Sequence, residues 1–257
     1  MSRYFARALM TGALAVVTLT ACQPDAPNKA ANQDTANQNG ASSSGPMASG
    51  DDIVRDFSLS NFTHIEQLGI DEVKVRQGAN FAVQAKGRQQ DLDLLDLRVE
   101  NGKLIVARKS KLTTNGKGVD ILVTMPKLSS IALRGTGDVD VDILSGDTVS
   151  ALLAGAGEIS IDRVTAKSAA LSISGAGDLE IDAGTIDTGD YRLTGAGNLD
   201  AEKLQAKQIA VTSSGVGSVT AHASGAAKVS LLGVGDVTVT GGAKCQTTKQ
   251  GVGTVRC

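Results

Sequence analysis

The chain has almost no aromatic side chains: its 257 residues include no Trp, two Tyr and four Phe. Val, Ile, Leu and Ala must therefore fill the core, which favours a narrow, layered interior. A basic excess is also missing, because 25 Lys and Arg stand against 27 Asp and Glu, so we expect no nucleic-acid partner. Three cysteines are too few for a fold built on disulfides.

Residues 1–21 have the pattern of a lipoprotein signal peptide. Two arginines precede a run of apolar or small residues from 8 to 21, which is too short for a comfortable membrane span. The run ends in Leu-Thr-Ala-Cys22, which resembles the bacterial lipobox, where cleavage precedes a cysteine that becomes acylated. We therefore predict a lipid anchor on Cys22, the alternative being an ordinary signal peptide with a chance cysteine. Gln23, in place of Asp, is similar to lipoproteins sent to the outer membrane of a bacterium with two membranes.

Residues 22–52 contain almost no large apolar side chain and consist mainly of Asn, Gln, Ser, Ala, Gly and Asp. Such a segment buries too little surface to offset the entropy lost on ordering it. We expect a disordered tether with a reach of roughly 30 Å. It would join the lipidated Cys22 to a folded domain that occupies residues 53–257.

A Gly-x-Gly step recurs through the second half of the chain. It begins at Gly135, Gly155, Gly175, Gly195, Gly215, Gly233 and Gly251. A phosphate-binding glycine loop would occur once, between a strand and a helix. The calcium-binding nonapeptide repeat places its Asp two residues after the last glycine of the step, whereas here the acidic residue follows that glycine directly. The step therefore indicates a structural repeat of about 20 residues.

Apolar residues alternate on both sides of each step, as they do in strands with one buried face. Around Gly175, for example, Ile173 precedes the step and Leu179 and Ile181 follow it. We expect both glycines of the step to face inward, where the backbone bends too close to the axis for a Cβ. Further along each repeat the alternation slips by one residue and later slips back. One glycine bend and two slips predict three sides per turn.

Residues 129–257 are thus predicted to form an all-β, three-sided parallel β-helix, or β-solenoid, whose turns stack ~4.8 Å apart. Residues 53–128 are less regular but also alternate as strands. We expect them to form atypical turns that cap the open N-terminal end of the stack. Within them, 97–106 resembles a hairpin with Asn101-Gly102 at its turn.

Four segments carry a resemblance to a known family: VKVRQGANFAVQAKG from Val73, VENGKLIVARK from Val99, DILVTMPKL from Asp120, and the recurring GAGDLEI at Gly175. In motif and in order, residues 56–257 resemble the head GIN domain family, the heads of auto-transporter adhesins. The resemblance implies a right-handed β-helix on the bacterial envelope. It carries no catalytic residues to transfer, and we predict no cofactor.

Outward positions after the step hold a row of carboxylates. Calcium could bridge them, or they could form a solvated face that discourages aggregation; we favour the second and assign no metal site. The row comprises Asp138, Asp140, Asp142, Glu158, Asp162, Asp178, Glu180, Asp182, Asp200 and Glu202.

An enzyme that acts on polysaccharides through the acidic face is the alternative function. Such enzymes need a basic residue and usually aromatic platforms, and the repeat has only Tyr191, which the alternation places inside. His222 is expected in the outward row seven residues after the step, without a nucleophile beside it. A basic stretch from Arg108 to Lys117 could contact lipid head groups or remain a solvated loop.

We therefore predict no catalytic residues and no enzyme activity. The expected function is that of an envelope lipoprotein, anchored to a membrane, that acts as an adhesin-like binding module or as a structural module. Its expected partner is an envelope protein or a glycan.

The last prediction is a disulfide between Cys245 and Cys257. Cys22 is used by the lipid, and the exported compartment oxidises the remaining pair. Counted from Gly251, the two cysteines lie six residues before and six residues after the step, in inward columns. A bridge across this open end would close a short loop and stabilise it by about 3 kcal/mol.

Overall fold

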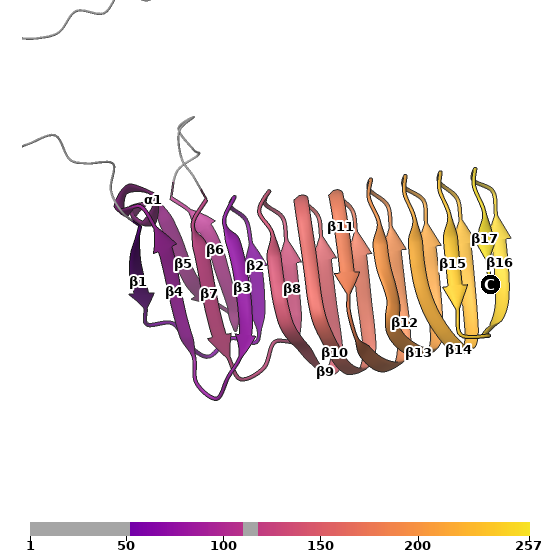
Figure 1. Ribbon diagram of the computed structural model, residues 1–257, viewed down its shortest axis with the longest axis horizontal. Coiled ribbons are helices and arrows are strands. Elements are labelled where there is room, and N and C mark those ends of the chain that lie inside the picture. Colours follow the sequence, from indigo (N-terminus) through magenta and orange to yellow (C-terminus); the bar gives the residue numbers. More distant parts are fainter. Residues whose placement is uncertain (1–51, 110–117) are drawn as a thin grey trace, which may run out of the picture. The chain divides into compact units, whose positions relative to one another are not determined.

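The protein is represented by a computed structural model that describes residues 52–109 and 118–257. From Val139 onward the chain winds as a parallel β-solenoid (Figure 1). The right-handed three-sided parallel β-helix predicted from the repeat and the resemblance is confirmed. Its strands are β9 (Val139–Leu153), β10 (Ala156–Ile173), β11 (Ala176–Ile181), β12 (Gly184–Leu193), β13 (Leu199–Ser213), β14 (Val219–Leu231), β15 (Val237–Thr240), β16 (Lys244–Lys249) and β17 (Val255–Arg256).

The three sides of a turn can be read from the register between neighbouring turns. β10 pairs with β9 residue by residue at a separation of 20, but Asp162 and Lys167 have no partner in this ladder. These two residues and the glycine step mark the corners. The second sides, which begin after Asp162, lie along the lower margin of the stack in Figure 1, and the glycine corners lie along its upper margin.

Inward columns of apolar residues form the core. Ile159 pairs with Val139 on one side and Leu179 on the other, and all three are fully buried. Tyr191 is buried as predicted, and its ring occupies the space that a Cβ on Gly189 would need. Burial raises the pKa of Tyr191 far above its ordinary value.

The glycines of the step are required for a different reason from the one predicted. A Cβ on Gly155 would lie 1.9 Å from the carbonyl oxygen of Gly135, and a Cβ on Gly175 would lie 1.9 Å from that of Gly155. The missing side chain would therefore collide with the preceding turn, along the stack, and not with the axis. From the second step onward, the second glycine also has a positive φ, as at Gly157 (148°).

The turns that begin at Gly215 and Gly233 contain 18 residues instead of 20. Three residues are lost at the first corner, where Ala221 pairs with Ala201 but the next residue, His222, pairs with Gln205, and one residue is gained at the second corner, so the turn is shorter by two. His222 therefore lies at the start of the second side, in register with Gln205 and Thr240. Its predicted place in the carboxylate row was wrong, because the alignment counted from the glycine ignored this deletion.

The first part of the domain caps the stack but does not wind in chain order. Its elements are β1 (Ile53–Phe57), β2 (His64–Gln67), β3 (Glu72–Gln77), β4 (Ala82–Gly87), α1 (Gln89–Asp93), β5 (Leu95–Glu100), β6 (Lys103–Arg108), β7 (Asp120–Met125) and β8 (Ser130–Leu133). β2 lies between β8 and β6, and β3 lies between β9 and β7, all in parallel. The later pair β6 and β7 is thus further from the regular stack than the earlier pair β2 and β3.

Antiparallel strands complete the cap. β4 pairs with β7 and β1 pairs with β4, so the outermost part of the domain is a sheet of mixed direction. The predicted hairpin is confirmed: β5 and β6 are antiparallel, and Asn101 and Gly102 have the positive φ values of its turn. No helix in the part of the chain described is long and apolar enough to cross a membrane.

Candidate functional site

A cleft of about 290 Å³ opens on the second side of the solenoid, across three consecutive turns. Its floor is Ala183 and Gly184, where the middle turn breaks between β11 and β12. Gly184 pairs with the buried Val164 in one neighbouring turn and the buried Leu204 in the other. Ala183 precedes Gly184, and it therefore lies between Arg163 and Lys203. The short alanine side chain between two long ones leaves the hollow.

Polar side chains surround this floor. Thr165, Thr185 and Gln205 are exposed and stack in register, one from each turn. Lys203 forms an ion pair with Asp182, and its Nζ lies 3.8 Å from Glu180. Arg163 has no ion pair with any residue that the structure describes. The cleft therefore offers hydroxyl, amide and carboxylate groups for hydrogen bonds and one cation whose charge is not neutralised.

The predicted carboxylate row exists on the exterior, and much of it has a structural use. Asp178 accepts hydrogen bonds from the backbone N–H (2.7 Å) and the side-chain amide (3.0 Å) of Asn198 in the next turn. Asn198 accepts from the N–H of Ser218 in turn. Asp138 binds the N–H of Glu158, and Asp236 binds that of Thr254. At these four steps the polar residue after the second glycine thus accepts a backbone hydrogen bond from the following turn at the corner.

Other carboxylates of the row are ion-paired or hydrogen-bonded. Asp142 pairs with Arg76, and Asp200 accepts a hydrogen bond from the Thr220 hydroxyl at 2.6 Å. Desolvation and the surrounding carboxylates, Asp138 first among them, raise the pKa of Glu158. Among residues 52–109 and 118–257, no three acidic, His or Cys side chains are grouped so that they could hold a metal ion.

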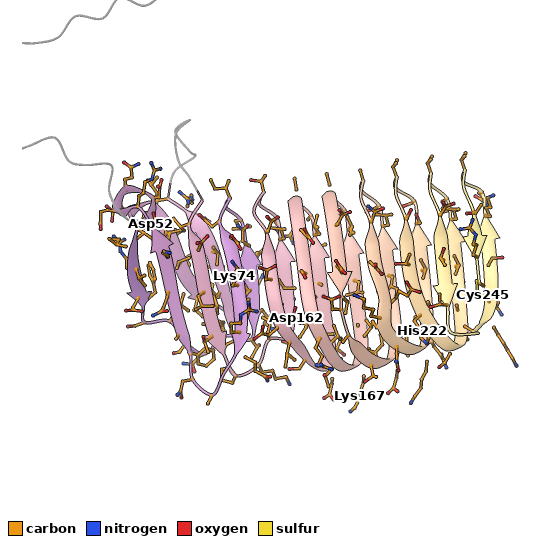
Figure 2. All side chains as sticks on the ribbon, viewed as in Figure 1. Asp52, Lys74, Asp162, Lys167, His222 and Cys245 are labelled. Atoms are coloured by element: carbon orange, nitrogen blue, oxygen red, sulfur yellow. A yellow bond between two sulfur atoms is a disulfide. The ribbon has the colours of Figure 1, made fainter. Side chains whose placement is uncertain are left out.

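Alternating charges occupy the corner that follows the second side. Lys167 pairs with Asp147 at 2.9 Å, and Lys207 pairs with Asp187 at 2.7 Å. Figure 2 shows Lys167 projecting at the lower margin of the stack, beyond Asp162. These surface pairs contribute little to stability, but they give Lys167 and Lys207 carboxylate partners, which Arg163 lacks among the residues described.

His222 is half-buried and shares a hydrogen bond of 3.2 Å with the Thr240 hydroxyl of the next turn. The same hydroxyl lies 3.4 Å from the carbonyl oxygen of Ala221. The imidazole also fills the space above Gly241, whose Cβ would come within 2.7 Å of the ring. These contacts give His222 a packing role in the shortened turn.

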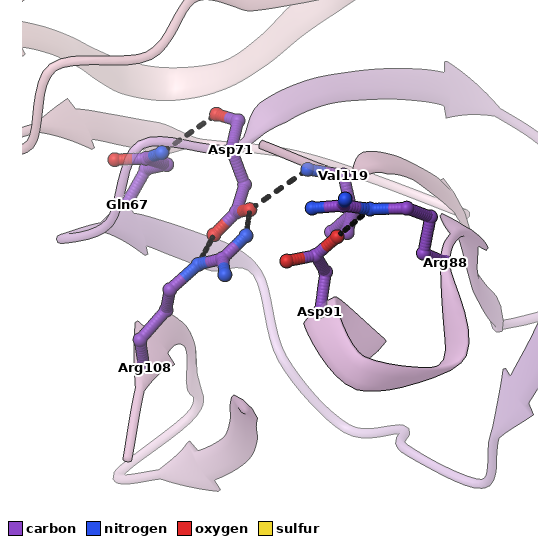
Figure 3. A network of polar contacts seen from close by, with 6 residues as sticks. All are labelled: Gln67, Asp71, Arg88, Asp91, Arg108 and Val119. Carbon is purple, nitrogen blue, oxygen red and sulfur yellow. Dashed lines mark hydrogen bonds and ion pairs between the residues drawn. The ribbon is translucent and has the colours of Figure 1, made fainter. Parts of the chain in front are cut away.

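Of the predicted basic stretch, the structure describes Arg108 and Lys109. Arg108 is buried and forms an ion pair with the fully buried Asp71, which also accepts a hydrogen bond of 3.0 Å from the N–H of Val119 (Figure 3). Gln67 donates to the carbonyl oxygen of Asp71 at 2.7 Å. Asp71 therefore joins the residues on either side of 110–117. Lys111 and Lys117 lie outside the residues described.

Of the predicted site residues, Cys22 lies outside the residues that the structure describes. Cys245 and Cys257 form a disulfide in the last turn, with Cα atoms 6.3 Å apart. Cys245 pairs with Ala227, which pairs with Ile209, so it continues the inward column assigned from the sequence. Figure 2 shows Cys245 at the C-terminal end of the stack.

Sequence reasoning missed the cleft. Its signal was present as Ala183-Gly184, two small residues where the neighbouring turns carry Arg163-Val164 and Lys203-Leu204. The fold is predicted from the apolar residues of the inward columns, and a small residue in an outward column does not change their alternation.

Comparison with known proteins gives a consistent assignment. A putative adhesin from Bacteroides fragilis is 26% identical, with a TM-score of 0.75, over 80% of this chain and 96% of that one. A putative adhesin from Parabacteroides distasonis is 18% identical (TM-score 0.62, 81% and 97%). A putative lipid binding protein from the same species is 17% identical (TM-score 0.60, 81% and 98%). The last two likenesses concern the fold alone. No curated protein matches the chain.

The family model described as "Putative auto-transporter adhesin, head GIN domain" matches residues 61–243. This range begins in the mixed cap and extends into the last turns of the solenoid, so it includes both the strands that wind out of chain order and the glycine steps. The chain belongs to this family of head GIN domains.

Proposed function

We propose that the protein is an adhesin-like, non-catalytic binding module of the bacterial envelope, and that its ligand is a glycan. The observation that carries this proposal is the polar cleft of about 290 Å³ on the second side of the solenoid. Ligand sites in proteins have volumes of about 300–1,000 Å³, so the cleft suits one or two sugar rings better than a protein segment. Membership of a family of adhesin heads supports the same function.

The proposal includes the lipid anchor. Cys22 would be acylated after removal of residues 1–21, and residues 23–52 would tether the solenoid to the outer membrane of a bacterium with two membranes. Many copies held on one membrane would bind a polymeric glycan together, which raises the overall affinity well above that of one site. A weak single site is therefore compatible with adhesion.

Two measurements test the proposal. The first is binding of the mature protein, in detergent, to immobilised envelope polysaccharides; saturable binding is expected, and its absence for all acidic and neutral polymers tested would refute a glycan ligand. The second is labelling of cells with radioactive palmitate. Labelling and membrane retention should be lost in Cys22→Ser, and equal retention of this variant would refute the anchor.

The enzymatic alternative is tested in the same preparations. Polysaccharides incubated with the protein and calcium should keep their chain length, because several carboxylates of the outward row are used in hydrogen bonds and ion pairs. Sustained cleavage that disappears in Asp178→Asn or Asp182→Asn would establish an enzyme and refute the non-catalytic function.

A further inference from the structure

We infer that the cleft recognises a sugar residue that carries a carboxylate, with Arg163 as the residue that binds the acid group. This inference rests on the proposed function and deepens it by naming the class of ligand. The two cations of the cleft differ in their surroundings. Lys203 is neutralised by Asp182 and has Glu180 nearby, whereas Arg163 has no such partner among the residues described.

The arrangement of the turns explains why Arg163 lacks a carboxylate partner while Lys203 has one. Arg163 and Lys203 belong to turns on either side of Ala183, so their backbones are separated by two strand spacings, ~9.6 Å. The Asp182 carboxylate at the first corner of the middle turn binds Lys203, on the C-terminal side. The arginine on the N-terminal side, which also lines the cleft, therefore has no carboxylate partner among the residues described.

A guanidinium favours a planar carboxylate, because two parallel N–H groups can donate to its two oxygens. The other groups of the cleft suit the hydroxyls of a sugar ring. Thr165 and Thr185 can donate or accept, Gln205 can do both through its amide, and Asp182 can accept from a ring hydroxyl. The cleft would thus bind the acid group of the ligand through one charged side chain, and the ring hydroxyls through several neutral hydrogen bonds.

The cleft contains no aromatic residue, since its lining is Arg163, Val164, Thr165, Asp182, Ala183, Gly184, Thr185, Lys203 and Gln205. A ring cannot stack on an aromatic face here, so discrimination must come from the charge and the hydrogen bonds. A neutral sugar of the same shape would lose the contact with Arg163. We therefore expect selectivity for the acid and a weak affinity for a single sugar.

The test is saturation-transfer NMR with the mature protein in detergent and three probes: galacturonic acid, galactose and acetate. Galacturonic acid should bind at least tenfold more tightly than galactose or acetate. Arg163→Ala should weaken its binding at least tenfold, and Ala183→Leu should do the same by filling the hollow. Lys167→Ala removes one positive charge four residues away, outside the cleft, and should leave binding unchanged.

Four other outcomes overturn the inference, and a fifth overturns the proposed function instead. Equal binding of galactose would show that the acid group is not recognised, and equal binding of acetate would show that the sugar is not. An equal loss in Lys167→Ala would indicate general attraction by surface charge. Binding of polysaccharide without any effect of Arg163→Ala or Ala183→Leu would refute this cleft while preserving the proposed function. Uronate binding at the cleft without polysaccharide binding would refute the proposed function and preserve the assignment of the cleft.

Discussion

Replacement of Gly195 by alanine tests the packing of the glycine corners. Gly195 lacks the positive φ found at Gly197, so alanine can adopt its backbone conformation and only the steric effect remains. The added Cβ would lie 1.9 Å from the carbonyl oxygen of Gly175, whereas ordinary contact begins at 3.4 Å. Relief of the clash therefore requires the two turns to move apart locally by about 1.5 Å, from a normal separation of ~4.8 Å.

Such a movement breaks hydrogen bonds between the turns. Ala196 donates to the carbonyl oxygen of Gly175 at 2.9 Å, and Gly195 donates to that of Ile173 at 3.2 Å. Each bond contributes about 0.5–1.5 kcal/mol, and forcing an extra methyl group into a filled position costs about 1–3 kcal/mol more. The lower entropy of alanine in the unfolded chain returns only ~0.4–1 kcal/mol. We expect Gly195→Ala to lower the free energy of unfolding by about 2–4 kcal/mol.

Urea denaturation followed by circular dichroism measures this loss, and hydrogen exchange should locate it in the turns that contain Gly175 and Gly195. Ala196→Val is the matched control. Ala196 points outward between the two glycines, and the next turn carries an exposed Val216 at the paired position. This larger substitution should change stability by less than about 0.5 kcal/mol. A loss below 1 kcal/mol in Gly195→Ala would show that the turns separate easily and that the steric reasoning is wrong.

Three further predictions concern the faces, the charges and the closed end. Ile181→Asp should lower the thermal midpoint far more than Glu180→Lys, because Ile181 is 1% exposed and a buried unpaired carboxylate costs several kcal/mol; the reverse ranking would disprove the register. Glu158 has a raised pKa, so the folded state binds more protons and stability falls as pH rises through that pKa. Glu158→Gln should match the parent in acid and exceed it at neutral pH, and a parallel pH dependence would contradict this. Reduction of the Cys245–Cys257 bond should cost about 3 kcal/mol; free thiols at both positions in envelope-derived protein would refute the bridge.

Much of the solenoid could be predicted from local spacing. The recurring step and the alternation around it place Leu179 and Ile181 in the core, and both are buried. Tyr191 and Cys245 fall in the columns expected of them by the same count. The reason is that turns of constant length bring residue i onto residue i+20, so that a one-dimensional period becomes a list of contacts.

Counting positions from the glycine step gives the wrong register where the length of the turn changes. His222 moved out of the carboxylate row because three residues of the previous turn, between Ala201 and Gln205, have no partner in the shorter one. A deletion of this kind is visible in the spacing of the glycines, but the spacing does not show where in the turn it falls. Its position depends on which corner can lose residues while the apolar columns of neighbouring turns stay aligned. Packing of Ala221 and Ala223 in the core makes that choice.

By itself, the sequence determined the repeat, the buried face of each strand and the inward column of Cys245, because these depend only on residue spacing. Only the tertiary structure decided that β2 and β3 insert between the regular stack and β6 and β7. It alone placed Arg108 in a buried pair with Asp71 and opened the cleft above Ala183. These features depend on which segments meet across the stack and on the size of side chains in neighbouring turns, and a period in one strand carries no information about either.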